Sequence, residues 1–144
     1  MTRICVASDH RGFEAKAKVI SYLKKKNYEV LDFGPDVPDM VDYPIYAKKV
    51  GHAVASGEAD YGILICATGI GMSIACNRIK GVRCARVCDV DDVKHTRNDN
   101  DANVIAFSSG LKKYKMYDIL DTFLTTKFSN EERYIRRNKM LDED

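Results

Sequence analysis

The feature that most constrains the fold of this chain is an alternation of short β-branched runs with longer segments of helical period. The strand-like runs lie near residues 3–8, 28–33, 61–66, 82–87 and 103–107. Between the first two, an amphipathic stripe is formed by Phe13, Ala17, Ile20 and Leu23. Such alternation is typical of βαβ units, in which right-handed crossover helices join parallel strands.

Three more helices complete this pattern. One begins at Asp42-Tyr43-Pro44 and ends before Gly57, and one carries its apolar face on residues 116–123. The last is predicted to open at Ser129-Asn130-Glu131-Glu132, the spacing of a capping box. We therefore expect one domain over residues 1–144 with an α/β fold, a Rossmann-like three-layer sandwich whose five-stranded parallel sheet has the order 2-1-3-4-5.

Composition excludes several classes of protein. The apolar runs fall far short of the roughly 20 residues that span a bilayer, so we expect no membrane partner. The first residues enter a strand-like run with no sign of a secretory signal, which predicts a cytoplasmic protein. Five cysteines without a CxxC pair argue against a zinc or disulfide framework, and a net charge of +2 with interspersed signs argues against nucleic acid.

Ligands of such sheets bind beyond the carboxyl ends of the strands, where strand order reverses, here between the first and third strands. The first strand ends in Ser8-Asp9-His10-Arg11-Gly12. Asp9 suits the hydroxyls of a polyhydroxylated anion and His10 its phosphate. The alternative is that Asp9 only caps the following helix and His10 is merely exposed.

The third strand ends in Cys66, followed by Ala67-Thr68-Gly69-Ile70-Gly71. Backbone amides at such a turn form an anion site, and the same field favours a thiolate. A cysteine in an apolar strand is otherwise a small core residue.

Other motifs do not fit this loop. A dinucleotide fingerprint would need glycine where Ile74 stands, and a cysteine phosphatase loop would need arginine where Met72 stands. A P-loop would require a lysine followed by serine or threonine, which the loop lacks.

Two further segments carry candidate groups. Residues 96–103 form a polar stretch before the fifth strand, and Arg133 and Arg137 share a face of the last helix at spacing i, i+4. Two guanidinium groups so placed are a good phosphate clamp, whereas the alternative is a solvated helix face.

Together these residues resemble the family of ribose-5-phosphate isomerase B and galactose-6-phosphate isomerase, from Ile4 to about Met140. The resemblance is carried by residues 8–12, Val41-Asp42-Tyr43-Pro44, residues 65–77, Asn100-Asp101-Ala102-Asn103-Val104 and residues 132–137. It implies a cofactor-free and metal-free isomerisation between ribose 5-phosphate and ribulose 5-phosphate.

The resemblance also assigns roles. Cys66 is the base that moves a proton between C2 and C1, and the region from Thr68 to Gly71 cradles the enediolate. The sugar site is lined by Asp9, His10, Tyr43, Ala67, Gly69, Ile70 and Asn100. Arg133 and Arg137 hold the phosphate. The family forms homodimers or dimers of dimers that share the site between subunits, so the last helix, residues 129–141, is expected at a subunit interface.

The chain departs from the family pattern at two positions. Asp99 stands where the ribose enzymes usually have a ring-opening histidine. Three interpretations follow: Asp99 serves ring opening, His95 one turn earlier supplies the titrating group, or Asp99 only positions the sugar. Gly110 replaces a phosphate-binding arginine, for which Lys112 or Lys113 is a candidate substitute. Two readings stay open beside ribose 5-phosphate: a hexose 6-phosphate substrate such as that of galactose or allose, and a non-catalytic receiver-like binding module.

Overall fold

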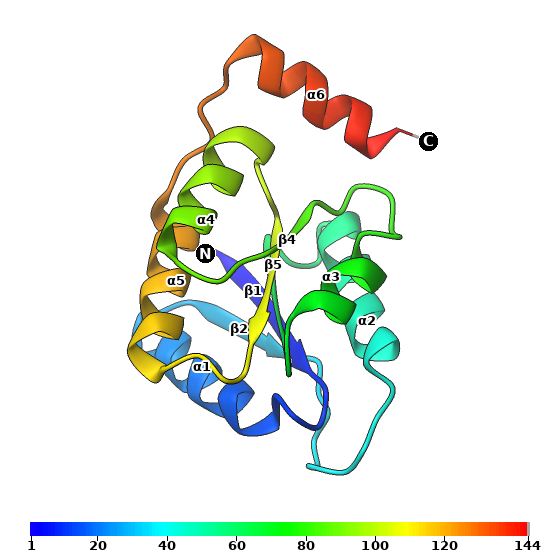
Figure 1. Cartoon of the computed structure of the whole chain (residues 1–144), viewed down its shortest axis with the longest axis vertical. Coiled ribbons are helices and arrows are strands. Elements are labelled where there is room, and N and C mark those ends of the chain that lie inside the picture. Colours follow the sequence, from blue (N-terminus) through cyan, green and yellow to red (C-terminus); the bar gives the residue numbers. More distant parts are fainter. Residues whose placement is uncertain (144) are drawn as a thin grey trace.

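A computed structural model, described for residues 1–143, contains a five-stranded parallel sheet between two layers of helices (Figure 1). The elements are, in chain order, β1 (Arg3–Ser8), α1 (Phe13–Lys25), β2 (Glu29–Asp32), α2 (Tyr43–Ser56), β3 (Tyr61–Cys66), α3 (Ile70–Cys76), β4 (Cys84–Arg86), α4 (Val90–His95), the π-helical turn η1 (Thr96–Asn100), β5 (Val104–Ser108), α5 (Lys113–Thr125) and α6 (Glu132–Asp142). The predicted fold class and the five strand positions are thereby confirmed.

The strands lie in the order β2-β1-β3-β5-β4, so the predicted order of the last two strands was wrong. β5 is buried on both faces and pairs with β3 as well as β4, whereas β4 has only three residues and ends in the exposed Arg86. A short strand with a charged residue suits a sheet edge, and an all-apolar strand suits the interior. The reversal of strand order between β1 and β3 is as predicted.

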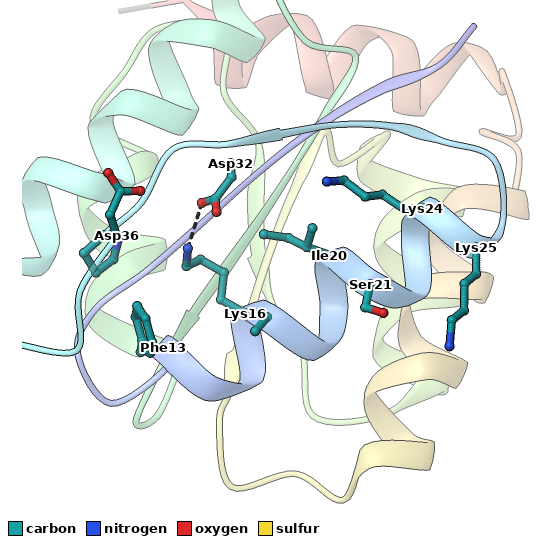
Figure 2. A pocket seen from close by; sticks show the side chains of 10 residues that line it. Phe13, Lys16, Ile20, Ser21, Lys24, Lys25, Asp32 and Asp36 are labelled. Carbon is teal, nitrogen blue, oxygen red and sulfur yellow. Dashed lines mark hydrogen bonds and ion pairs between the residues drawn. The ribbon is translucent and has the colours of Figure 1, made fainter.

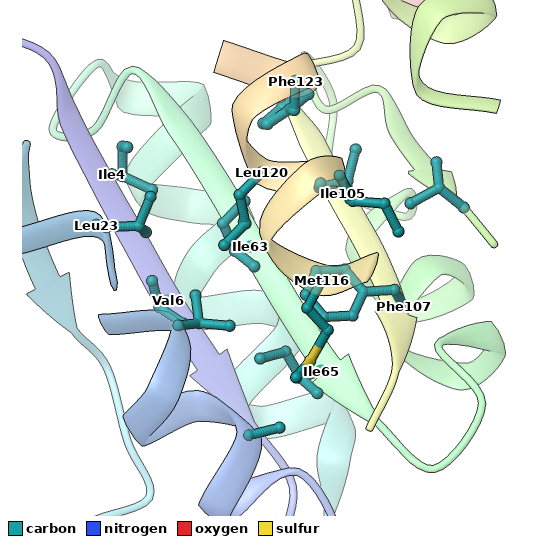
Figure 3. Close-up of a cluster of buried hydrophobic side chains, with 14 of the residues drawn as sticks. Ile4, Val6, Leu23, Ile63, Ile65, Ile105, Phe107, Met116, Leu120 and Phe123 are labelled. Carbon is teal, nitrogen blue, oxygen red and sulfur yellow. The ribbon is translucent and has the colours of Figure 1, made fainter. Parts of the chain in front are cut away.

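Side chains alternate between the two faces of the sheet and form two separate cores. One face carries large residues, among them Ile63, Ile105 and Phe107, beneath α1 and α5 (Figure 3). The opposite face carries small residues such as Cys5, Ala7 and Ala106 beneath α2 and α3. Small side chains let these two helices lie close to the strands, which brings the start of α3 down beside the end of β3.

Helix α6 lies beyond the amino ends of the strands, apart from the rest of the molecule (Figure 1). It begins at Glu132, and the predicted capping box is wrong because the N-cap is Glu131 and no side chain caps the helix. The Ser129 hydroxyl donates to the carbonyl of Asn98, at 2.9 Å. Within α6 only Asn138 is buried, while Ile135, Met140 and Leu141 are exposed. Across residues 1–143 there is no helix long and apolar enough for a membrane span.

Candidate active site

Cys66 closes β3 and is 6% exposed. Its Sγ accepts a hydrogen bond from the backbone amide of Gly69 at 3.0 Å. The thiol is therefore held by the loop that follows it, and an N–H aimed at sulfur stabilises the thiolate more than the neutral thiol.

Glycine is required at position 69 for two reasons. Its φ of 80° is in the left-handed region, and a Cβ there would lie 2.9 Å from the backbone of Phe107 in β5. The loop consequently rests directly on the neighbouring strand. Ser109 donates its amide to the Cys66 carbonyl at 2.8 Å, and the Ser108 hydroxyl donates to the Ala67 carbonyl at 2.6 Å.

The rest of the loop is also ordered by its own contacts. The amide of Ile70 donates to the Thr68 hydroxyl oxygen at 3.1 Å, which leaves the O–H of Thr68 as a donor on an exposed side chain. A Cβ on Gly71 would lie 2.7 Å from the ring of Tyr43. Tyr43 thus lies across the loop because residue 71 has no side chain, and the structure brings together the predicted site residues from Cys66 to Gly71 with Tyr43.

Asp9 and His10 follow β1 at the same edge of the sheet. Asp9 is 8% exposed, and its Oδ1 accepts from the amide of Gly12 at 2.9 Å, in the turn before α1. The capping alternative is wrong, because Gly12 is the N-cap of α1 and no side chain caps that helix. Its own amide donates to the Ile65 carbonyl at 3.2 Å, which ties this carboxylate to the residue before Cys66. The Nδ1 of His10 accepts a long hydrogen bond from the amide of Val41, at 3.5 Å, which in neutral imidazole leaves the proton on Nε2.

The remaining predicted residues lie elsewhere. Asp99, Asn100 and Arg137 line one cavity of about 510 Å³ between η1 and α6. Arg133 is on the exposed part of α6, where its guanidinium lies 3.6 Å from the Glu131 carboxylate and donates to the Tyr134 hydroxyl at 3.1 Å. The two residues predicted to contact the sugar, Asp99 and Asn100, therefore share a hollow with one of the two predicted phosphate-binding arginines.

This cavity and Cys66 are at opposite ends of the sheet. β3 and β5 are parallel, with Gly62 beside Val104 and Cys66 beside Ser108. η1 precedes Val104 directly, so the length of β5, roughly 13 Å at 3.3 Å per residue, separates Asn100 from Cys66. Within one chain the structure does not bring the two groups together.

The structure gives little support to a partnership of His95 with Asp99. His95 is exposed and is not among the residues that line the cavity. The intervening turn is a π-helix, so the α-helical spacing assumed from the sequence does not apply. The Asp99 carboxylate accepts instead from the side-chain amide of Asn98 at 2.8 Å.

One residue at the carboxyl edge was missed by the sequence analysis. The Nε of Arg86 donates to the Thr68 carbonyl at 3.1 Å. Its signal in the sequence is a charged residue in an otherwise apolar run, but that pattern alone predicts only an edge strand.

The other cysteines are not equivalent to Cys66. Burial raises the pKa of Cys5 to about 12, and a hydrogen bond with Cys76, together with burial, raises the pKa of Cys84. Both remain thiols at neutral pH. Cys88 is exposed and is therefore not a packing residue. In residues 1–143 no three histidine, cysteine or acidic side chains are placed to hold a metal ion.

Another hollow, of about 650 Å³, lies between α1 and the β2 edge (Figure 2). None of the predicted site residues lines it. Its buried cation, Lys16, is already paired with Asp32 at 2.7 Å, so we do not assign the reaction to this hollow.

Comparison with known proteins gives the chain a family. A family model described as Ribose/Galactose Isomerase matches residues 4–141. The chain is 40% identical to ribose-5-phosphate isomerase B of Escherichia coli, covering 89% of this chain and 87% of that protein. It is 36% identical to galactose-6-phosphate isomerase subunit LacB of Clostridium acetobutylicum, covering 97% and 82%.

Comparison with solved structures agrees with this family assignment. The crystal structure of a ribose 5-phosphate isomerase from Thermotoga maritima matches with a TM-score of 0.95 and 44% identity, over 99% of both chains. These matches confirm the predicted enzymatic character, an isomerase acting on sugar phosphates, over a non-catalytic receiver-like module. The chain belongs to the ribose/galactose isomerase family.

Proposed function

We propose that this enzyme interconverts D-ribose 5-phosphate and D-ribulose 5-phosphate through an enediolate, with Cys66 as the base. The observation that carries the proposal is the Cys66 thiol, held by the Gly69 amide at the carboxyl end of β3. The names of the Escherichia coli and Thermotoga maritima relatives support the pentose phosphate as substrate.

The chemistry needs a base and a group of donors. The Cys66 thiolate removes the C2 proton of the open-chain aldose, and the electron pair moves to the carbonyl oxygen to form the enediolate. The thiol then returns the proton to C1, while a proton passes from O2 to O1. The O–H of Thr68, together with loop amides other than those of Gly69 and Ile70, supplies the donors that stabilise the oxyanion.

The substrate's other end is proposed to be held by a second copy of the chain. Asn100, Arg133 and Arg137 lie too far from Cys66 of the same chain to share one small substrate. Helix α6 also exposes three apolar side chains, Ile135, Met140 and Leu141, that a partner could cover. In an isologous dimer, α6 of each copy reaches the carboxyl edge of the other.

Loss of the usual arginine at position 110 places more of the phosphate's binding energy on Arg133 and Arg137. The backbone amide of Gly110 already has a partner within its own loop, because it donates to the Ser108 hydroxyl oxygen at 3.0 Å. Lys112 and Lys113 stand at the start of α5 and are exposed. We propose that they are solvated and that the arginines of α6 form the clamp.

A hexose phosphate is the second candidate substrate. Similarity to the galactose-6-phosphate isomerase subunit, together with Asp99 in place of histidine, favours testing it. Purified enzyme should be assayed in parallel with ribose 5-phosphate, galactose 6-phosphate and allose 6-phosphate, with and without EDTA. The pentose assignment predicts the highest kcat/KM for ribose 5-phosphate, unchanged by EDTA; a higher value for either hexose phosphate contradicts it.

The shared site is tested by mixing two variants, Cys66→Ala and Arg137→Ala, at a substrate concentration far below the wild-type KM, where loss of the base or a raised KM leaves each variant alone with little activity. Each mixed dimer would carry one intact and one doubly mutated site, so co-refolded protein is expected to regain roughly a quarter of wild-type activity. If each chain builds its own complete site, the mixture stays as inactive as its parts. The controls are each variant refolded alone.

A further inference from the structure

The peptide unit between Thr68 and Gly69 is hydrogen-bonded at both of its polar atoms. Its N–H donates to the Sγ of Cys66 at 3.0 Å, and its carbonyl oxygen accepts from the Nε of Arg86 at 3.1 Å. A peptide is a single resonance unit, so a cationic donor at its oxygen makes its N–H a stronger donor. The two contacts form one chain from guanidinium to sulfur.

We propose that Arg86 is a positioning residue for Cys66, which orients and polarises the 68–69 peptide so that its N–H stabilises the thiolate. The proposal deepens the assignment of Cys66 as the base and rests on it for its catalytic meaning. The effect of Arg86 on the ionisation of the Cys66 thiol can be measured without substrate.

The location of Arg86 supports a role directed at the loop. It is the last residue of the edge strand β4, beside Ala106 of β5, and its side chain must extend past the small side chain of that strand to reach Thr68. Phe107 fixes the other side of the loop by its close approach to Gly69. The 68–69 peptide is thus held by steric contact on one side and by a charged donor on the other.

The charges around Cys66 make such a donor useful. Asp9, from β1, is a nearly buried carboxylate whose charge opposes a thiolate at the same edge. His10 and Arg11 follow it, and Tyr43 comes from α2. The loop after β5 carries one charged side chain, the exposed Lys112 just before α5, and α3 adds none. Arg86, from β4, places its positive charge directly on the loop.

The test is the rate of iodoacetamide alkylation of Cys66 as a function of pH, measured without substrate. Cys88 is exposed and would also react, so all variants carry Cys88→Ser and labelling is read at the Cys66 peptide by mass spectrometry. Arg86→Met keeps most of the side-chain stem and removes the guanidinium. It is expected to slow alkylation at pH 7 roughly three- to tenfold, because one charge-assisted hydrogen bond is lost. At high pH the two rates should converge.

Two matched variants separate this role from others. Arg86→Lys keeps a cationic donor and is expected to recover at least half of the lost rate. Arg11→Gln removes an exposed charge from the same edge and should leave alkylation within about twofold of the reference. An equal loss in Arg11→Gln would show a general field effect and overturn the role of the peptide. A constant loss at every pH would show simple disruption of the loop, and would overturn it as well.

Steady-state kinetics provide the second readout. A positioning role predicts that Arg86→Met lowers kcat and moves the acid limb of its pH profile upward, with little change in KM. If Arg86 instead grips the phosphate, KM rises while the alkylation profile stays as in the reference protein, and the proposal fails. Should Cys66→Ser retain full turnover, the base assignment fails, yet the alkylation experiment still decides whether Arg86 controls the thiol.

Discussion

The two ends of the sheet differ in how completely one chain builds them. At the carboxyl end, Cys66 and its loop are held by hydrogen bonds from Gly69, Ser108 and Ser109 and by the close approach of Phe107. At the amino end, α6 is mostly exposed; Asn138 donates to the Asp99 carbonyl of η1 at 3.1 Å, and Asp142 forms an ion pair with Arg83 at 2.7 Å.

The difference matches the two proposed roles: proton transfer at the carboxyl end and phosphate binding at the amino end. Proton transfer needs groups placed to within a fraction of an ångström, which a packed strand end provides. Binding a phosphate needs charge that reaches outward, which an exposed helix provides. A dimer that apposes the two ends would combine a rigid base with a clamp supplied by its partner.

The largest expected effect comes from removing the base. Cys66→Ala should lower kcat about 10²–10⁴-fold while the thermal unfolding midpoint changes much less, because the substitution removes only one sulfur atom at the end of β3. Turnover is measured by a coupled assay, and binding of the sugar phosphate by calorimetry. Near wild-type turnover would contradict the assignment of Cys66, at the carboxyl end of β3, as the base.

Removing the clamp should affect binding instead. Arg137→Ala is expected to raise KM roughly 10- to 100-fold with a much smaller change in kcat, since the phosphate does not react and a charged hydrogen bond is lost. Arg136→Ala, one position earlier on α6 and not lining the cavity, is the matched control. Normal substrate binding in an Arg133→Ala/Arg137→Ala double variant would place the phosphate elsewhere, with Lys112 and Lys113 as the next candidates.

A smaller and directional effect is expected at Asp99, which lines the same cavity as Arg137. If its carboxylate serves ring opening, Asp99→Ala should slow the first turnover from ribose 5-phosphate about tenfold, and slow that from ribulose 5-phosphate, which has no furanose ring, much less. Asp99→His should restore the ribose direction. Equal slowing from both substrates in rapid-mixing experiments would assign Asp99 to hydroxyl contacts instead.

The smallest effect concerns the core between the two ends. Burial raises the pKa of Cys5 to about 12, whereas in the unfolded chain the thiol titrates near its usual value of about 8.5. The folded state therefore holds this proton more tightly, and its stabilisation is complete below pH 8.5 and declines as the pH rises toward 12. The free energy of unfolding should fall by up to about 1.4 kcal/mol per pH unit from this group.

Urea denaturation between pH 8 and 10.5 measures that slope. Cys5→Ala should flatten it, whatever the variant's stability at pH 7, and the exposed Cys88 replaced by alanine should leave it unchanged. The same slope in Cys5→Ala would assign the alkaline destabilisation to other groups, among them Tyr22, whose pKa is also raised to about 12, chiefly by burial.

Local pattern alone identified the elements of this protein. Alternating short apolar runs and amphipathic segments predicted the five strands and the parallel α/β class, and the cysteine followed by a glycine-containing turn indicated the reactive end of β3. These features are legible because strand and helix periods, and the need for glycine at a left-handed position, act over a few neighbouring residues.

Tertiary structure decided the rest. Sequence order could not show that β5 lies between β3 and β4, that η1 and α6 face away from Cys66, or that Arg86 reaches the carbonyl of Thr68. Each of these depends on which distant segments pack together. The neighbours of a strand depend on which buried faces pack together best. The partner of a long side chain depends on where its backbone lies in the folded protein. Neither is encoded in the spacing of nearby residues.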